Sequence, residues 1–231
     1  MQKLIFSIIL LVLVPAFARA DVVDQNLGCT IITQPNIASG DNEGLGQTFT
    51  AISGFTVTDV IYQARKQNNP TGNAYAKLYE LTGTYGTDAK PSGSAFATSD
   101  AKPASTFDSA LASTTFTFSG LNQAELTAGT NYIVTIEFTG GDASNYLEIA
   151  WCGNVFDGNI SYTSDLASWT GDNTWDAIYQ LNGDPVAGEE TGTATTSTTT
   201  AGTLLDSEQL FIWGVIIFIL ALPMWARLFR F

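Results

Sequence analysis

The chain has no histidine, two cysteines and only nine lysine and arginine residues among 231. Without histidine it cannot form a Ser-His-Asp triad or a histidine-ligated zinc or copper site, and two cysteines are too few for a Cys₄ zinc site. Its 22 acidic residues give a formal net charge of −13. Duplex nucleic acid is therefore not an expected partner, because phosphate binding needs clustered basic residues. With no P-loop and no Gly-rich dinucleotide fingerprint either, we expect a protein that is not an enzyme and requires no cofactor.

Residues 1–20 have the features of a secretory signal peptide. Lys3 precedes the short apolar run Leu4–Val14, and Ala18-Arg19-Ala20 fits the small-x-small cleavage pattern. The apolar run is shorter than the roughly 20 residues that span a bilayer. We therefore expect the mature chain to begin at Asp21, outside the cytoplasm; an uncleaved N-terminal anchor is the alternative.

The C-terminal part of the chain divides into a Thr/Ser-rich linker, a transmembrane helix and a basic cytoplasmic tail, at residues 186–205, 206–226 and 227–231. The linker has too few large apolar residues to offset its ordering entropy. Acidic residues precede the apolar run Leu210–Ala226, and Arg227 and Arg230 follow it. The positive-inside rule then places the tail in the cytoplasm, or inside a virion envelope, and the domain outside. No sortase-type motif precedes the run, so we expect a single-pass protein retained in membrane lipid. The alternative is a buried core helix.

Residues 21–185 form the expected ectodomain, in which short alternating runs are broken by turn residues. In Tyr132–Thr139, for example, the apolar side chains fall on one face, which is typical of a half-buried antiparallel strand. We predict an all-β fold, an antiparallel two-sheet β-sandwich that is jelly-roll-like, plus one C-terminal transmembrane helix. The expected strands are Cys29–Gln34, Gln47–Ala51, Phe55–Lys66, Asn73–Leu81, Ser94–Thr98, Thr115–Phe118, Tyr132–Thr139, Tyr146–Trp151, Asn159–Tyr162 and Asp176–Leu181.

The two cysteines and one asparagine are candidates for covalent modification. An oxidising compartment permits a disulfide between Cys29 and Cys152, which would close a long loop and stabilise the fold by about 4–5 kcal/mol in the loop-entropy model. Sequence spacing alone does not show whether the two side chains are within reach of each other. Asn159-Ile-Ser161 is a glycosylation sequon, so Asn159 is a candidate glycan site in a glycosylating host.

Aromatic residues of the C-terminal third are the candidate ligand contacts: Trp169, Trp175 and Tyr162. The two tryptophans flank the polar loop Thr170–Thr174, and flat apolar rings with polar neighbours suit sugar rings or peptide contacts. Trp151 alternates with other apolar residues, so we expect it in the core. Core packing is also the alternative for the other three aromatics, because large aromatic side chains mostly pack.

Calcium is the one cofactor for which the sequence offers ligands. Asp142, Asp157 and Asp172 lie in loop-like stretches and supply carboxylate oxygens of the kind that calcium prefers. No EF-hand spacing occurs, and aspartate also favours turns for backbone reasons alone. Both interpretations stay open.

Several fragments follow one another along residues 45–182: Gln47-Thr-Phe-Thr-Ala51, Gly54-Phe-Thr-Val-Thr58, Pro70-Thr-Gly72, Pro91-Ser-Gly-Ser94, Leu126-Thr-Ala-Gly-Thr-Asn-Tyr132, Ser144-Asn-Tyr146 and Ser168-Trp-Thr170. In this order they resemble the choice-of-anchor R family of surface β-sandwich domains with varied C-terminal anchors. The resemblance implies a displayed β-sandwich, and similar domains occur in phage and viral structural proteins. It implies no catalytic motif, it transfers no site residue, and residues 21–44 do not match it.

We therefore expect a membrane-anchored, extracytoplasmic β-sandwich on a stalk, which is non-catalytic and serves binding or adhesion at the cell surface, with a glycan or a surface protein as partner. The alternative is a structural component of a virion spike or envelope, or of a cell-envelope coat. The second alternative is a surface-tethered hydrolase that uses paired carboxylates.

Overall fold

The computed structural model describes residues 20–28, 36–37 and 43–186. Apart from their boundary residues, the expected signal peptide, linker, transmembrane helix and basic tail lie outside these ranges and stay predictions. Within the described ranges, no helix is long and apolar enough to cross a membrane. The described part of the chain contains β-strands and two short 3₁₀ helices, η1 (Ala104–Thr106) and η2 (Gly120–Asn122), but no α-helix.

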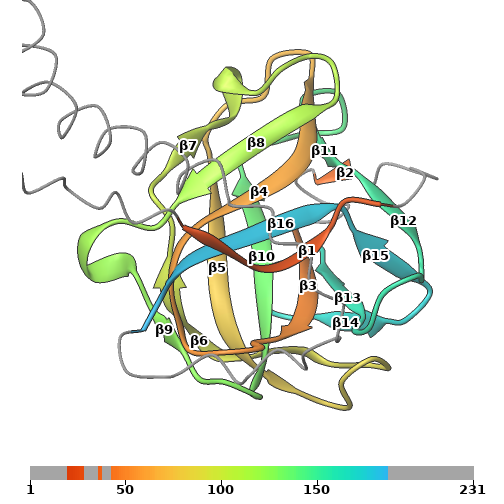
Figure 1. The fold of residues 1–231 in the computed structure, drawn as a ribbon. Coiled ribbons are helices and arrows are strands. Elements are labelled where there is room, and N and C mark those ends of the chain that lie inside the picture. Colours follow the sequence, from red (N-terminus) through yellow and green to blue (C-terminus); the bar gives the residue numbers. More distant parts are fainter. Residues whose placement is uncertain (1–19, 29–35, 38–42, 187–231) are drawn as a thin grey trace, which may run out of the picture. The chain divides into compact units, whose positions relative to one another are not determined.

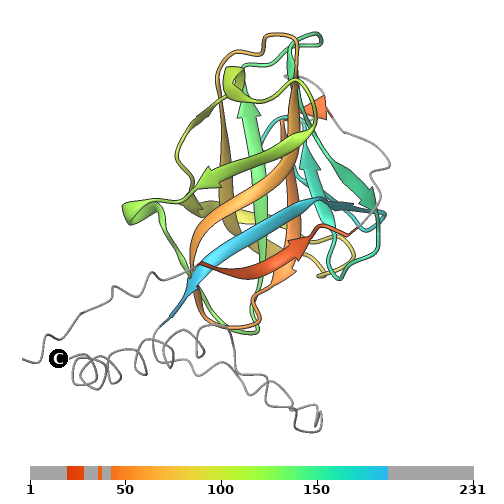
Figure 2. The same cartoon turned by 45° about the horizontal axis from the view of Figure 1, so that its top comes forward.

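Two large antiparallel sheets lie face to face in a β-sandwich-like arrangement (Figures 1 and 2). The first sheet is built on the long strand β4 (Phe55–Gln67). One edge of β4 pairs with β16 (Tyr179–Pro185) and then with β11 (Tyr146–Ile149), whereas β9 and β8 pair with its other edge. β1 borders β16, and β2 borders β11. The bounds of these remaining strands are β1 Asp21–Asn26, β2 Asn36–Ile37, β8 Ala112–Thr117 and β9 Glu125–Leu126.

The second sheet is centred on β10 (Asn131–Thr139), which lies between β3 (Gly44–Thr50) and β5 (Asn73–Thr82). Beyond β3 the sheet continues with β13 and β14, and β6 and β7 pair with the free edge of β5. A separate two-stranded ribbon joins β12 to β15. The bounds are β6 Lys90–Thr98, β7 Lys102–Pro103, β12 Trp151–Gly153, β13 Ile160–Thr163, β14 Thr170–Asp172 and β15 Trp175–Ala177.

The central strand β10 is buried on both of its faces. One face contributes Tyr132, Val134, Ile136 and Phe138 to the main core between the sheets. The period of two places the intervening side chains on the outer face, yet these are also at most 3% exposed: Ile133, Thr135 and Glu137. Other parts of the chain must therefore cover the outer face of this sheet, and the candidate site lies there.

A junction at Gln63 explains how the chain leaves the first sheet to form the β12–β15 ribbon. The backbone N–H of Gln63 donates to the Ile178 carbonyl at 3.2 Å, and its carbonyl accepts from the Ala150 N–H at 2.8 Å. The Ile178 N–H in turn donates to the Ala150 carbonyl at 3.0 Å. At this point β11 and β16 part: β11 is followed by β12 and β15 leads into β16, and these two strands pair as the ribbon.

The all-β, antiparallel class predicted from the sequence is confirmed. Each expected strand from Gln47 onward has a counterpart, but two of them are interrupted, at Ala150 and Ile178, where the junction forms. The strand β1 was not expected, because its sequence, DVVDQN, shows no clear alternation. The expected strand at 29–34 lies outside the described residues.

Candidate functional site

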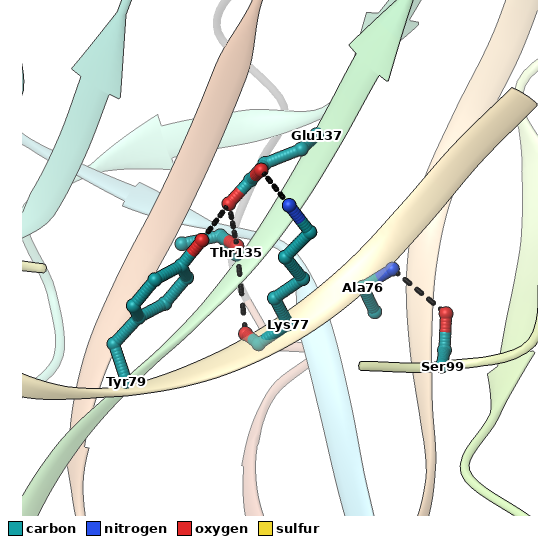
Figure 3. A network of polar contacts seen from close by, with 6 residues as sticks. All are labelled: Ala76, Lys77, Tyr79, Ser99, Thr135 and Glu137. Atoms are coloured by element: carbon teal, nitrogen blue, oxygen red, sulfur yellow. Dashed lines mark hydrogen bonds and ion pairs between the residues drawn. The ribbon is translucent and has the colours of Figure 1, made fainter. Parts of the chain in front are cut away.

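The outer face of the second sheet holds a buried carboxylate, that of Glu137 (Figure 3). Its Oε2 accepts from Lys77 Nζ at 2.6 Å, and its Oε1 accepts from the Tyr79 hydroxyl at 2.6 Å and from Thr135 Oγ1 at 3.1 Å. Lys77 and Tyr79 come from β5 and the other two residues from the neighbouring strand β10. The antiparallel pairing thus gathers three donors around one acceptor group.

This network fixes the position of the Lys77 ammonium. The Glu137 side chain is 4% exposed and that of Lys77 is 26% exposed, so the lysine compensates a carboxylate that would otherwise be buried at high cost. Burial raises the pKa of Tyr79, and its hydrogen bond to the Glu137 charge raises it further. Tyr79 therefore stays a neutral phenol that donates its proton to Glu137, and part of the lysine remains open to solvent.

The segment after β13 covers this face because β3 contributes glycines beneath it. A Cβ added to Gly44 would lie 2.7 Å from Cη2 of Trp169, and one added to Gly46 would lie 2.9 Å from Ile133 and Thr135 side-chain atoms. Such distances are below any ordinary van der Waals contact. The missing side chain of Gly44 therefore lets the Trp169 indole lie directly against the sheet.

Asp165 holds the loop that carries Trp169. Its Oδ1 accepts from the backbone N–H of Ser168 at 2.6 Å, from that of Ala167 at 2.9 Å and from Thr163 Oγ1 at 2.9 Å. These bonds, with the Ser168 N–H first, lower the pKa of Asp165 to about 2. Leu166 has a φ of 56°, a left-handed conformation that costs a residue with a Cβ free energy. The loop is thus held in one shape by specific bonds.

A cavity of about 370 Å³ opens between this loop and β6. Its lining includes Trp169, Lys77 and the hydroxyl residues Tyr79, Ser94 and Thr98. A flat aromatic face beside a few fixed polar groups is suited to a sugar ring, which is apolar on its faces and polar at its edge. None of the described residues that line this cavity carries a carboxylate.

Of the three aromatic candidates, the structure brings Trp169 alone to this cavity. Trp175 stacks on Trp151, with ring centroids 5.3 Å apart and an interplanar angle of 9°, and both pack against the main core. Tyr162 is partly exposed and also packs against the core. For Trp175 and Tyr162 the packing alternative therefore describes the structure better than a ligand contact in this cavity.

The three calcium candidates do not come together. Asp142 accepts from the backbone N–H groups of Ser144 and Asn145, and Asp172 accepts from that of Thr174, so both shape turns. Asp157 lies elsewhere, at the edge of a second cavity. Across the described ranges, no group of three Asp, Glu, His or Cys side chains is arranged to hold a metal ion. A calcium site formed by these three aspartates is therefore not found, and the turn interpretation accounts for two of them.

The modification candidates have different outcomes. Cys152 is 1% exposed and disulfide-bonded, whereas Cys29, the chain's other cysteine, lies outside the described residues. Asn159 is fully buried, and its Nδ2 donates to the carbonyls of Ala89 and Ile160, both at 2.8 Å. The folded domain thus leaves no room for a glycan on Asn159, and the sequon prediction is wrong for the folded state.

Sequence reasoning missed Lys77, Tyr79, Glu137 and Asp165. The alternation in β10 did place Glu137 on the face opposite the core, but a local pattern carries no sign that a distant loop will cover that face. Comparison with protein-family models, curated proteins and solved structures finds no match to this chain. The resemblance to the choice-of-anchor R family therefore stays a prediction.

Proposed function

We propose that this chain is a non-catalytic, membrane-anchored module that binds a glycan in the cavity beside Trp169. The observation that carries the proposal is the position of this indole. It is partly exposed, rests on a glycine of β3, and borders a cavity with hydroxyl groups and one lysine. Aromatic rings on a rigid support bind with little loss of side-chain entropy, so this arrangement favours recognition of a ring-shaped, polyhydroxylated ligand.

The chemistry of the cavity favours binding over hydrolysis. Glycoside hydrolysis needs two carboxyl groups on either side of the scissile bond, and the described lining of this cavity contains none. The nearby Glu137 is already engaged by three donors. A surface-tethered hydrolase at this cavity is therefore not supported.

The strand order supports the finer fold prediction, a jelly roll. The described strands of six residues or more are, in chain order, β1, β3, β4, β5, β6, β8, β10 and β16. One sheet has the order β1-β16-β4-β8, which are the first, eighth, third and sixth of these strands. The other has the order β3-β10-β5-β6, which are the second, seventh, fourth and fifth. This alternation between sheets corresponds to the double Greek key of a jelly roll. Lectins and viral capsid proteins both use that fold, so the fold alone does not indicate which of these functions the protein has.

Display outside a membrane is the second part of the proposal, and it rests on the sequence. A signal peptide at 1–20 would export the chain, the linker 186–205 would act as a stalk, and the apolar segment 206–226 would anchor it, with the tail 227–231 in the cytoplasm. The resemblance to the choice-of-anchor R family agrees with such a role. Adhesion at a surface follows if the bound glycan belongs to another cell or to a matrix.

A glycan array probed with the full-length protein in detergent tests the binding proposal, followed by titration of any glycan that binds. We expect Trp169→Ala to weaken binding at least tenfold, the loss that about 1.4 kcal/mol produces. Phe156→Ala is the matched control, because it removes a ring that is 38% exposed and does not line this cavity. If no glycan binds at millimolar concentration, or if both variants bind equally well, the proposal fails.

The same jelly-roll order also favours the structural alternative, since capsid proteins share it. In that case the chain is part of a virion spike or envelope, or of a cell-envelope coat. It predicts many copies in a regular array. Electron microscopy of the native membrane or particle would show a lattice or a symmetric spike in that case, whereas a binding module would be scattered.

A further inference from the structure

A second cavity, of about 270 Å³, lies away from Trp169 and shares no lining residue with the first. Its walls come from β1, from β3 and its end, and from the loops around Tyr85 and Phe156. Two of its described lining residues are aspartates, Asp24 and Asp157, and none is a lysine or an arginine. It is therefore a concave site with aromatic walls and uncompensated negative charge.

Asp24 is built into the floor of this cavity. Its Oδ2 accepts from the Tyr179 hydroxyl, and its Oδ1 accepts from the backbone N–H of Gln25 at 2.9 Å. Tyr179 is 2% exposed and belongs to the main core, so the aspartate is held from the inside. Burial raises the pKa of Asp24, while these two hydrogen bonds oppose that effect. The carboxylate is thus fixed at the cavity and partly withdrawn from water.

Asp176 provides a third carboxyl group, which does not line the cavity but is hydrogen-bonded to two residues that do, Gln47 and Phe156. Asp176 is fully buried, and its Oδ2 accepts from the backbone N–H groups of Val155 and Phe156 at 2.8 and 3.0 Å. Its Oδ1 accepts from Gln47 Nε2 at 3.2 Å. These bonds fix the backbone at Phe156, and with it the loop that carries Asp157, but they supply no positive charge.

The phenol of Tyr85 lines the same cavity as Asp24 and Asp157. Burial is the largest cause that raises the pKa of Tyr85, and the charges of Asp24, Asp157 and Asp176 raise it further, whereas a hydrogen bond with Thr50 lowers it. Across the described ranges the two ion pairs, Arg65–Glu148 and Lys77–Glu137, both lie elsewhere. The described lining of this cavity therefore holds two carboxyl groups and no basic side chain.

We propose that this cavity binds an organic cation, with a primary ammonium group directed to Asp24 and Asp157 and an alkyl stem against Tyr85 and Phe156. An ammonium group supplies the missing counter-charge and donates up to three hydrogen bonds, which carboxylates accept strongly. The aromatic rings attract the cation through their faces and bury its stem. A divalent metal fits less well, because no metal-type cluster exists among the described residues and the lining includes the rings of Tyr85, Phe156 and Tyr179. The lysine side chain of a protein and a free amine share this chemistry.

The test uses n-butylamine, which is a cation at neutral pH, and n-butanol, which has the same alkyl chain and no charge. The full-length protein in neutral detergent is titrated with each and followed by ligand-observed NMR. We expect butylammonium to bind and butanol to bind at least tenfold more weakly. Raising the ionic strength from about 0.01 M to about 0.15 M should weaken the binding of butylammonium, because the screening length falls from roughly 30 Å to 8 Å. Equal binding of both probes would overturn the proposal.

Two substitutions with equal charge change locate the site. Asp157→Asn should weaken butylammonium about tenfold, the loss expected for one hydrogen bond to a charged group. Asp108→Asn removes the same charge from an exposed loop position outside the cavity, so we expect no change. Asp157 is itself exposed, and its variant should fold normally. Identical affinities for the two variants would mean that only the net charge attracts the amine, and the proposed site would then be wrong.

Further measurements distinguish this site from the cavity beside Trp169 and distinguish an amine from other ligands. Phe156→Leu should weaken the binding of butylammonium. Trp169→Ala should leave that binding unchanged even if glycan binding is lost. Nα-acetyl-lysine amide, which keeps a free ε-ammonium group, should compete with butylammonium if a protein lysine is the natural partner. Competition by small alkylamines alone indicates a free amine instead. Displacement of butylammonium by calcium chloride or by glucose at equal ionic strength would instead assign the cavity to a metal or a neutral sugar and overturn the proposal.

Discussion

Replacing Glu137 by glutamine is the most direct test of the network beneath the Trp169 cavity. The substitution keeps the shape of the side chain and removes its charge. The new amide oxygen can still accept one bond from Tyr79 or Thr135, but the amide NH₂ group would meet the Lys77 ammonium, donor against donor. The lysine then loses its counter-charge, and at least one of the three hydrogen bonds in the network is lost.

The expected loss of stability is about 2–3 kcal/mol. Removing one partner of a buried ion pair typically costs about 3–5 kcal/mol. The value is lower here because 26% of the Lys77 side chain is exposed and water can solvate part of its charge. Lys77→Met should also destabilise, since it leaves the Glu137 carboxylate without a cation. The double variant should lose at least about 1 kcal/mol less than the sum of the single variants, because the two side chains contact each other directly.

Urea denaturation of the full-length protein, followed by far-UV circular dichroism, measures these differences. The slope of free energy against urea should stay the same, since the surface exposed on unfolding does not change. Glu125→Gln is the matched control at an exposed strand position, with an expected effect within about 0.5 kcal/mol. A loss below about 0.5 kcal/mol for Glu137→Gln, or strict additivity with Lys77→Met, would refute the network as a support of this sheet.

Three further predictions concern the loop, the ribbon and the anchor. The hydrogen bonds of Asp165 require its charge, and its pKa falls on folding from 3.8 to about 2. These bonds should therefore support the loop fully above pH 4 and be lost as the pH falls toward 2. Tryptophan fluorescence should show this acid transition in the unmodified protein and not in Asp165→Ala. Trp175→Ala should destabilise the fold by about 2–3 kcal/mol, because a packed aromatic ring is lost, and thermal unfolding should show a larger loss than for Trp169→Ala. Deleting residues 204–231 should move the protein from the membrane to the soluble fraction with its strand circular dichroism intact, and aggregation of that variant would contradict the anchor.

The sequence predicted the strands well because their side-chain period is local. Tyr132 to Phe138 alternate along one strand, and any pairing partner that buries this face preserves the pattern. The interruptions at Ala150 and Ile178 were not predictable in this way, because they depend on three segments meeting at Gln63. A continuous apolar run does not show where a strand exchanges one neighbour for another.

The candidate site was only partly predictable for a similar reason. Trp169 was expected because it flanks a polar loop, but Trp175 was named on the same grounds and packs against Trp151 instead. Glu137 looked like an ordinary solvent-facing residue, and its burial requires the loop at Asp165 to fold back over Gly44. The glycine that makes this possible lies far from both residues in the chain, so no local signal connects them.

Both cavities depend on the stretch between the end of β10, at Thr139, and the start of β16, at Tyr179. This stretch carries Trp169 for one cavity and Phe156 with Asp157 for the other, whereas strands outside it provide the rigid floors of both. Loops on a rigid scaffold can change their ligand contacts with little effect on the fold. On both of our proposals, the ribbon and loops of this stretch determine which ligand binds, and the surrounding strands hold them in place.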